Sequence, residues 1–285
     1  MSSLTLAFDT RSRSRFLAGR VRLRRRDLAT IVLLVLIIVI ALFGASAAPY
    51  DPLKPQMSAR LAPPSRDHVM GTDPLGRDVF SRVLAGAGVS LRGVVVIIVS
   101  AVSLGIVLGT AAGYFGGLLD DTVMRLTDSF LAFPALVLAL AIAGALGPSL
   151  TNALLAVSLV WWPWYARLVR GQVRSIKLEP YVEAVRCLGC SDARIMSRHI
   201  LPNFLAPVMI QATLDLGAAL VTTASLSYIG MGAQPPSPEW GAMLNLGRAF
   251  FLNAWWLTAF PGLAIFLTVL LFNAAGDRVR AALPN

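Results

Sequence analysis

Residues 181–203 read YVEAVRCLGCSDARIMSRHILPN and separate two apolar stretches that are each long enough to cross a membrane. The quoted residues carry too many charges to enter a membrane themselves. They predict two short helices, the first of which stops at Gly189, because glycine tolerates the left-handed conformation found at helix ends. Ser191 or Asp192 can cap the second helix, and Pro202 suits the first turn of the helix that follows. We call residues 181–203 the elbow.

Each predicted helix of the elbow has one apolar side and one polar side. The apolar side predicts packing against the rest of the protein, and the polar side predicts contact with water. A rigid, water-exposed pair of helices between membrane spans is typical of a docking element for a soluble partner. The apolar residues are Val182, Val185 and Leu188 in the first helix, and Ile195, Met196 and Ile200 in the second.

The chain as a whole is strongly apolar. Its 285 residues are 56% hydrophobic and 14% charged, against about 25% charged in ordinary globular domains. Six segments of roughly 18 residues or more carry few or no charges, which is the length needed to cross about 30 Å of hydrocarbon. The sequence therefore predicts an all-α, polytopic membrane protein with six spans, at residues 28–48, 93–115, 129–147, 148–166, 204–230 and 251–276.

Positive charge predicts the orientation of these spans. Residues 1–27 contain eight arginines, and such charge is retained on the cytoplasmic side. The first span is too long for a cleavable signal peptide, so six spans place both termini in the cytoplasm. The outer segments, 49–92 and 231–250, then hold seven of the 25 lysines and arginines. The other 18 lie in the inner segments, 1–27, 116–128, 167–203 and 277–285.

The elbow therefore faces the cytoplasm in this topology. The net charge of +10 is explained by topology and by anionic lipid headgroups, so membrane lipid rather than nucleic acid is the expected partner. The predicted organisation is a basic N-terminus, a first span, an outer segment, a five-helix core that includes the cytoplasmic loop 167–203, and a C-terminus. Their ranges are 1–27, 28–48, 49–92, 93–276 and 277–285.

The outer segment 49–92 contains its own turn and helix signals. Asp73 and Pro74 can start a turn, and Gly76 permits a sharp bend. Asp78 is placed to cap a helix whose apolar residues have helical spacing. We expect this helix to lie at the outer membrane interface before the second span, with a solvated loop as the alternative.

Three local patterns describe the spans further. Gly105 and Gly109 form the G-x-x-x-G spacing that allows two helices to approach closely. Phe133-Pro134 is expected to kink or to start the third span, because proline removes an internal hydrogen bond. The cluster Trp161, Trp162, Trp164 and Tyr165 is expected to anchor the fourth span at a membrane interface.

One acid and one loop are candidates for contact with a solute or a partner. Asp215 is the acid in the middle of the fifth span, so it is either a translocation-path residue or a hydrogen-bonded structural aspartate. The proline-rich outer loop is either a surface for a soluble partner or a cap on the bundle. We favour the partner-facing role, with Pro236, Glu239 and Trp240 as the candidates.

The sequence contains no pattern for catalysis. The two lysines, Lys54 and Lys177, do not follow a glycine, so a Walker-type ATP site is excluded, and no G-x-S-x-G is present. His68 and His199 lie on opposite sides of the predicted membrane. We therefore predict no catalytic residue, no metal site and no cofactor in this chain, and an energy source in another chain.

The cysteines Cys187 and Cys190 form a C-x-x-C spacing within the elbow. Such a pair can be redox-active or can bind a metal, but it supplies two ligands where a tetrahedral zinc site needs four. We interpret them as small packing residues near the turn.

The elbow resembles the EAA loop of ABC-importer permeases, whose pattern is Glu-Ala-Ala, three residues, Gly, and Leu-Pro after a longer gap. Glu183, Ala184 and Gly189 match the pattern, and Leu201-Pro202 lie in register. Val185 replaces the third residue of the pattern, an alanine. His199 also departs from the family, because its position is usually aliphatic. Neither change should prevent a helix from forming.

Further segments extend the resemblance over most of the chain from about residue 30. They are similar to segments of the C-type permease of dipeptide, oligopeptide and nickel ABC importers, in the same order. These segments are GTDPLGRDVFSR, GYFGGLLDDTVMR, DSFLAFPALVLAL, SYIGMGAQPPSPEWGAML and FNAAGDRVR.

This resemblance implies the type I ABC-importer permease fold in a bacterial plasma (inner) membrane. It implies a homologous second permease, two ATPase subunits or one fused ATPase that hold ATP and Mg, and an extracytoplasmic substrate-binding protein. The pair of permeases would form the path for peptides or similar small solutes. The residues implied in ATPase coupling are Glu183, Ala184, Val185, Arg186, Gly189, Leu201 and Pro202.

Two other classes of function are weighed against this one. An ion-coupled secondary carrier would need ionisable relays inside its spans, and Asp215 alone supports it. A structural or signalling membrane protein would show no transport under any condition.

Overall fold

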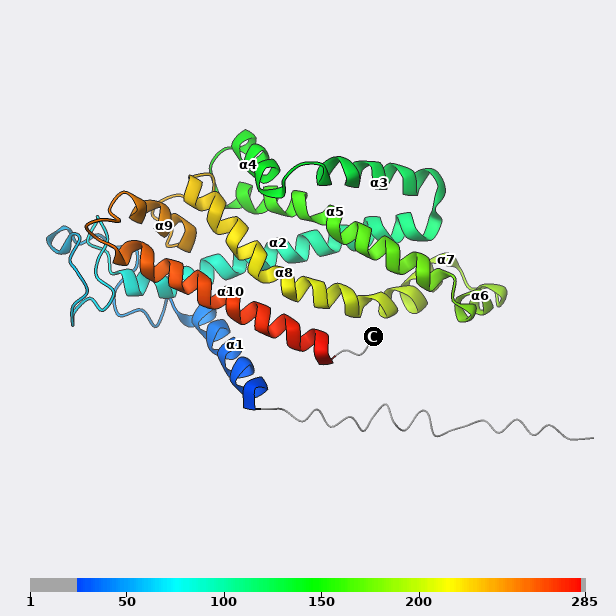
Figure 1. The fold of residues 1–285 in the computed structure, drawn as a ribbon, viewed down its shortest axis with the longest axis horizontal. Helices are drawn as coiled ribbons and strands as arrows, with labels where there is room; N and C mark the ends of the chain where they lie inside the picture. Colours follow the sequence, from blue (N-terminus) through cyan, green and yellow to red (C-terminus); the bar gives the residue numbers. More distant parts are fainter. Residues whose placement is uncertain (1–24, 283–285) are drawn as a thin grey trace, which may run out of the picture.

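The fold is a bundle of helices (Figure 1), known from a computed structural model that describes residues 25–282. This part of the chain contains no strand. Its helices are α1 (Arg25–Phe43), η1 (Met57–Ala59), α2 (Val79–Phe115), α3 (Gly117–Leu131), α4 (Ala135–Leu146), α5 (Leu150–Lys177), α6 (Pro180–Cys187), α7 (Asp192–Ile195), η2 (Met196–Ile200), α8 (Leu201–Ile229), α9 (Trp240–Arg248) and α10 (Trp256–Ala282).

Helix α2 begins where the sequence predicts. The Asp78 side chain caps it by accepting a hydrogen bond of 2.8 Å from the Ser81 backbone N–H. Before the cap, Gly76 adopts φ +73°, which confirms the predicted bend. The helix then continues for 37 residues, a length of about 55 Å.

The expected interfacial helix and the second span are therefore parts of one helix. The prediction of a separate helix at the membrane interface is wrong. The outer turns of α2 are buried in the protein, with Val79 only 1% exposed. Because no proline interrupts residues 79–115, nothing breaks the helix between its outer turns and its apolar remainder.

Glycines on α2 bring its backbone against α5. A Cβ added to Gly105 would lie 2.4 Å from the Tyr165 Cβ, and one added to Gly109 would lie 2.5 Å from the Ala166 carbonyl oxygen. One turn further, a Cβ at Gly113 would lie 2.9 Å from the Arg170 carbonyl oxygen. These distances leave no room for a side chain, which confirms the close approach predicted from the G-x-x-x-G spacing. We call Gly105, Gly109 and Gly113 the glycine seam.

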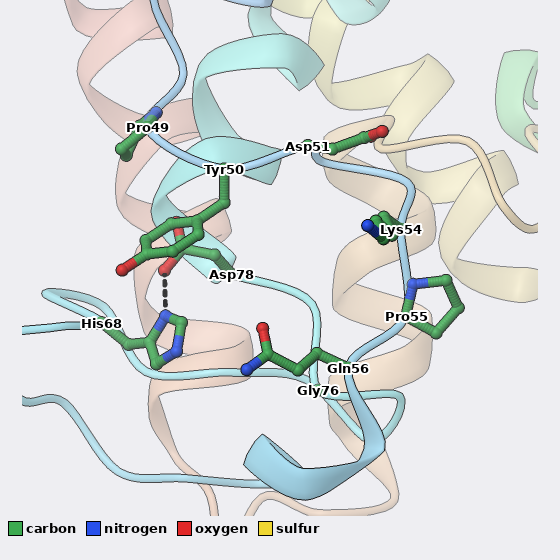
Figure 2. Close-up of a pocket in the computed structure, with 9 residues that line it drawn as sticks. All are labelled: Pro49, Tyr50, Asp51, Lys54, Pro55, Gln56, His68, Gly76 and Asp78. Atoms are coloured by element: carbon green, nitrogen blue, oxygen red, sulfur yellow. Dashed lines mark hydrogen bonds and ion pairs between the residues drawn. The ribbon is translucent and has the colours of Figure 1, made fainter.

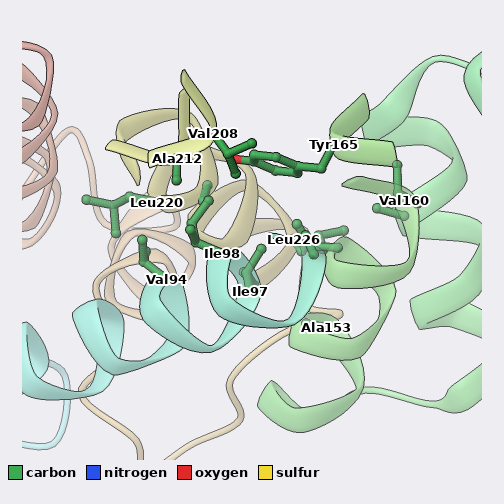
Figure 3. Packing of buried hydrophobic residues seen from close by; sticks show 14 of the residues in the cluster. Val94, Ile97, Ile98, Ala153, Val160, Tyr165, Val208, Ala212, Leu220 and Leu226 are labelled. Atoms are coloured by element: carbon green, nitrogen blue, oxygen red, sulfur yellow. The ribbon is translucent and has the colours of Figure 1, made fainter. Parts of the chain in front are cut away.

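A buried apolar cluster joins α2 and α5 to α8 (Figure 3). Tyr165 and Trp162 lie in the interior, whereas Trp164 is 53% exposed. The expectation of an anchoring aromatic cluster is therefore wrong for Tyr165 and Trp162, because their side of α5 faces the bundle. The cluster includes Val94, Ile97, Ile98, Ala153, Val160, Val208, Ala212, Leu220 and Leu226.

The predicted third span, residues 129–147, is not one straight helix. Helices α3 and α4 meet at 92°, and Pro134 stands at the N-cap of α4. Proline cannot continue the hydrogen bonding of α3, and it disfavours helical geometry at Phe133. Phe133-Pro134 thus starts a new helix, which was one of the two expected outcomes. This helix, α4, has only 12 residues.

The number of membrane spans stays a prediction. Among the described residues, three helices are long and apolar enough to cross a membrane, and the bent pair α3–α4 would make a fourth. The apolar part of α1, Ala29–Phe43, is shorter. The first and last elements also differ from the expected limits, because α1 ends at Phe43 and α10 continues to Ala282. Most of the basic N-terminus, residues 1–24, lies outside the described residues.

We expect Gly105→Ala to lower the free energy of unfolding by about 1–3 kcal/mol, because the added methyl group overpacks the contact with Tyr165. The measurement is thermal unfolding of the purified protein in detergent. Gly171→Ala on α5 is the matched control, since no atom lies within 4 Å of its Cβ position. The control should be neutral or stabilising by up to about 1 kcal/mol. Equal effects of the two substitutions would contradict the close contact.

Candidate functional site

The elbow lies at one end of the bundle, opposite the end that carries α9 (Figure 1). Its first helix, α6, stops at Cys187, and Gly189 follows with φ +79°, which confirms the predicted left-handed glycine. Ser191 occupies the N-cap position of α7, but its side chain forms no capping hydrogen bond. The Asp192 side chain points to Tyr114 instead.

The elbow buries one side and exposes the other. Val182, Ile195 and Ile200 are fully buried, as their apolar spacing predicts. Leu188 is 82% exposed, so its expected place on the buried side is wrong, because it follows the last turn of α6 and no longer shares that face. Of the residues implied in coupling, Val185 and Leu201 are half-buried, and the exposed ones are Glu183, Ala184, Arg186, Gly189 and Pro202.

The second helix of the elbow does not stop before the next span. Helix α7 passes through the π-helical turn η2 into α8, so residues Asp192–Ile229 form one continuous helix. Pro202 lies in the first turn of α8, as predicted. Its ring removes a backbone donor and crowds the carbonyl one turn earlier, which accounts for a widened turn just before it. The sequence predicted the position of Pro202 in the helix but not the π-helical turn before it.

Tyr114, in the last turn of α2, connects the elbow to the bundle. Its hydroxyl donates a hydrogen bond to the Asp192 carboxylate, and Arg186 Nη2 donates to the same hydroxyl at 3.2 Å. Lys177 Nζ donates to the Tyr114 carbonyl oxygen at 2.5 Å and lies 5.2 Å from the ring centroid. The Arg186 guanidinium lies 5.8 Å from that centroid. No sequence pattern pointed to Tyr114, because its partners are 63 to 78 residues away.

An ion pair joins α3 to α5. Arg170 donates two hydrogen bonds to the Asp120 carboxylate, at 2.5 and 2.6 Å. Arg174 Nη1 lies 3.8 Å from the same carboxylate. The hydrogen bond from Arg170 is the main reason why the pKa of Asp120 lies below its ordinary value. A bidentate guanidinium–carboxylate pair of this kind fixes the relative orientation of the two helices.

The two cysteines differ in their surroundings and are both free. Cys190 is half-buried and packs against the apolar core, in agreement with the packing interpretation. Cys187 is exposed, so that interpretation is wrong for it. Within residues 25–282, no three His, Cys, Asp or Glu side chains are arranged to hold a metal ion.

Asp215 has a hydrogen-bond partner for each carboxylate oxygen. Tyr165 Oη donates to Oδ2 at 2.6 Å, and Gln211 Nε2 donates to Oδ1 at 2.9 Å. The side chain is half-buried. Of the two alternatives from the sequence, this geometry favours the hydrogen-bonded structural aspartate.

The outer loop turns two of its three candidate residues inward. Pro236 is exposed, but Glu239 and Trp240 are 0% and 2% exposed, so the expectation that these two face a binding protein is wrong. Glu239 caps α9 by accepting hydrogen bonds from Gly241 and Ala242, and burial raises the pKa of its carboxyl group. Trp240 Nε1 donates to the Val83 carbonyl at 3.0 Å.

The outer segment is tied to this loop by Arg82. Its guanidinium donates to the Pro52 carbonyl at 2.8 Å and to the carbonyls of Pro236 and Ser237 at 3.3 to 3.5 Å. The Asp73 carboxylate oxygen Oδ2 lies 3.6 Å from Arg82 Nε. The loop thus packs as a cap on the bundle, which was the alternative to a partner-facing surface.

A pocket of about 480 Å³ lies in the outer segment (Figure 2). His68 Nδ1 and Asp78 Oδ1 are 2.9 Å apart. The ring centroids of His68 and Tyr50 are 4.9 Å apart. Sequence reasoning recognised Asp78 as a helix cap and did not anticipate this pair. The remaining lining residues are Pro49, Asp51, Lys54, Pro55, Gln56 and Gly76.

Residues 105–284, which include the glycine seam, the elbow and α8, match the family described as binding-protein-dependent transport system inner membrane component. The chain belongs to this family. It is a multi-pass membrane permease, and its role is that of a transport subunit. This membership confirms the resemblance found in the sequence, and nothing in the comparisons favours an ion-coupled carrier.

Curated relatives resemble the permease over most of its length. It is 45% identical to the probable D,D-dipeptide transport system permease protein DdpC of Escherichia coli K12, over 87% of this chain and 84% of the relative. It is 42% identical to the dipeptide transport system permease protein DppC of Alkalihalophilus pseudofirmus, over 92% and 87%. The glutathione transport system permease protein GsiD of Escherichia coli O6:K15:H31 is 43% identical, over 92% and 88%.

The fold also matches a solved structure. A chain from the inward-facing MetNI methionine ABC transporter superimposes with a TM-score of 0.55 at 20% identity, over 71% of this permease and 96% of that chain. At this identity the likeness concerns the fold alone. It confirms the predicted all-α fold of a type I ABC-importer permease.

We expect Asp120→Asn to lower the free energy of unfolding by about 2 kcal/mol at pH 7, because Arg170 loses a charged acceptor. The pKa of Asp120 is depressed in the folded protein, so its contribution is fully present above the ordinary value of about 3.9. That contribution is lost as the pH falls through the lower, folded-state pKa. Thermal unfolding of wild type and variant over a series of pH values measures the difference.

Asp128→Asn is the control for this prediction. Asp128 pairs with Arg167, but their side chains are 66% and 48% exposed, so the change should stay below about 1 kcal/mol. The explanation fails if both variants lose equal stability at pH 7, or if the effect of Asp120→Asn increases as the pH falls below 3.9.

Proposed function

We propose that this permease imports small peptides and that its elbow binds the ATPase subunits that drive the import. The substrate class rests on the names of the relatives, which are permeases for a D,D-dipeptide, a dipeptide and glutathione. The coupling role rests on the elbow, because its outer side is exposed while its inner side is anchored in the bundle.

The exposed side of the elbow suits a protein partner. Around Gly189 the space is open, with no atom within 4 Å of its Cβ position. A backbone without a side chain allows close approach of a second protein. Leu188 beside it is 82% exposed, an apolar side chain that a partner would remove from water.

The elbow is also stiff enough to transmit a displacement. Its second half belongs to the continuous helix Asp192–Ile229, so movement of the elbow is passed directly to α8. In the assembly that we propose, ATP and Mg are held by two ATPase subunits or one fused ATPase on the cytoplasmic side. A homologous second permease completes the path, and both termini of this chain are cytoplasmic.

At the outer end, an extracytoplasmic binding protein delivers the peptide. Pro236 is the remaining exposed candidate for its contact. Asp215 stays a candidate for the translocation path, acting through the hydrogen bonds that hold it beside Tyr165. Anionic lipid around the basic N-terminus holds the permease in its orientation.

The test uses the complete transporter in proteoliposomes, with the second permease, the ATPases and the binding protein. L-alanyl-L-alanine, D-alanyl-D-alanine and glutathione are tried in this order. The first peptide that the wild-type transporter accumulates is the probe peptide for all variants. Accumulation of none would contradict the substrate class. Uptake by the permease without its ATPases, with collapse on addition of ionophores, would instead establish the ion-coupled carrier.

We expect Gly189→Phe to reduce uptake of the probe peptide per ATP hydrolysed by at least roughly tenfold, since losing a docking contact of about 1.4 kcal/mol changes binding tenfold. Gly147→Phe is the matched control. Gly147 also has positive φ, +91°, and no atom within 4 Å of its Cβ position, but it lies between α4 and α5, away from the elbow. Unchanged uptake in Gly189→Phe, or equal loss in both variants, would rule out the elbow as the coupling site.

A further inference from the structure

We propose that Tyr114 is a positioning residue that couples the elbow to α2, as a second route for its movement besides the covalent route into α8. This inference rests on the proposed function of the elbow. The two routes differ physically: the first is a continuous helix, whereas the second depends on the side-chain contacts of one residue.

The hydroxyl of Tyr114 contacts both helices of the elbow. It donates to Asp192, the first residue of α7, and accepts from Arg186, near the end of α6, at 3.2 Å. Because Gly189 lies between these two partners, the hydroxyl bridges the turn from inside. Hydrogen bonds with an ionised partner are stronger than neutral ones, so the bridge holds the two helices in one arrangement.

The rest of Tyr114 is fixed to α5. Lys177, the last residue of that helix, donates to the Tyr114 carbonyl at 2.5 Å and lies over the ring at 5.2 Å from its centroid. The Arg186 guanidinium lies over the same ring, and Phe115 packs against it edge-to-face at 5.3 Å. The ring, at 3% exposure, is therefore held independently of its hydroxyl.

Helix α2 carries this connection to the other end of the protein. The glycine seam locks it to α5, and its outer end carries Arg82, which holds the outer loop. A displacement of the elbow that reaches Tyr114 therefore acts on a helix that extends without interruption to the loop at the opposite end. Removing the hydroxyl should weaken this transmission and leave the bundle folded.

The experiment measures uptake of the probe peptide per ATP hydrolysed in the same proteoliposomes. Tyr114→Phe removes the bridge and retains the ring with its two cations. We expect the ratio to fall by roughly tenfold or more, because both charge-assisted hydrogen bonds of the hydroxyl, to Asp192 and from Arg186, are lost. The melting temperature and the amount of assembled complex should equal those of wild type. Asp192→Ala should give a similar loss, and the double variant should be no worse than either single one.

Tyr228→Phe is the matched control, because the Tyr228 hydroxyl has no hydrogen-bond partner among the described residues; its ratio should not change. The proposal is overturned if Tyr114→Phe keeps the wild-type ratio, if the effects of Tyr114→Phe and Asp192→Ala add, or if Tyr114→Phe prevents assembly, which would make the hydroxyl a folding requirement. Loss of coupling in Gly189→Phe with normal coupling in Tyr114→Phe would refute this inference alone. Normal coupling in both would refute the proposed function of the elbow.

Discussion

The direct contact between the backbones of α2 and α5 is the constraint on which the rest of the bundle depends. Inside a membrane, apolar side chains gain little by leaving lipid for protein, so helices associate through close packing of small residues. The glycine seam provides this packing over two turns. It places Tyr165 in the interior, where its hydroxyl reaches Asp215 on α8. It also sets the position of Tyr114, one residue beyond the seam, at the base of the elbow.

The two ends of the bundle treat their polar groups in opposite ways. At the outer end, Glu239 and Arg82 are buried and bind backbone groups of the chain itself, so the loop between α8 and α9 is built as a fixed cap. At the other end, the elbow exposes Glu183 and Arg186 and leaves open space around Gly189. An exposed surface with open space around it is available for a partner, whereas a buried cap is not. This contrast is why the elbow carries the proposed function.

The sequence predicted the features that local rules determine. Gly189 ends a helix, Asp78 caps one, and the spacing of Gly105 and Gly109 indicates close approach, because each depends on residues within one or two turns. The inward direction of Trp240 could not be predicted, since it depends on a carbonyl 157 residues away. The bridge at Tyr114 was missed for the same reason. For the third span, the sequence predicted a kink or a helix start at Pro134 but not the angle between α3 and α4, because a proline interrupts a helix without determining the direction of the next one.

The break between α3 and α4 has a consequence for the surrounding lipid. With 12 residues, α4 extends about 18 Å, well short of the roughly 30 Å of hydrocarbon in a typical bilayer. Along this flank, two short helices meet at 92° in place of one helix that is as long as the hydrocarbon layer is thick. A bilayer matches such a short helix by thinning locally, and a second polypeptide that covers the helix removes the need for thinning. Pro134 thus sets the length of apolar surface that α4 can offer to lipid or to a neighbouring polypeptide.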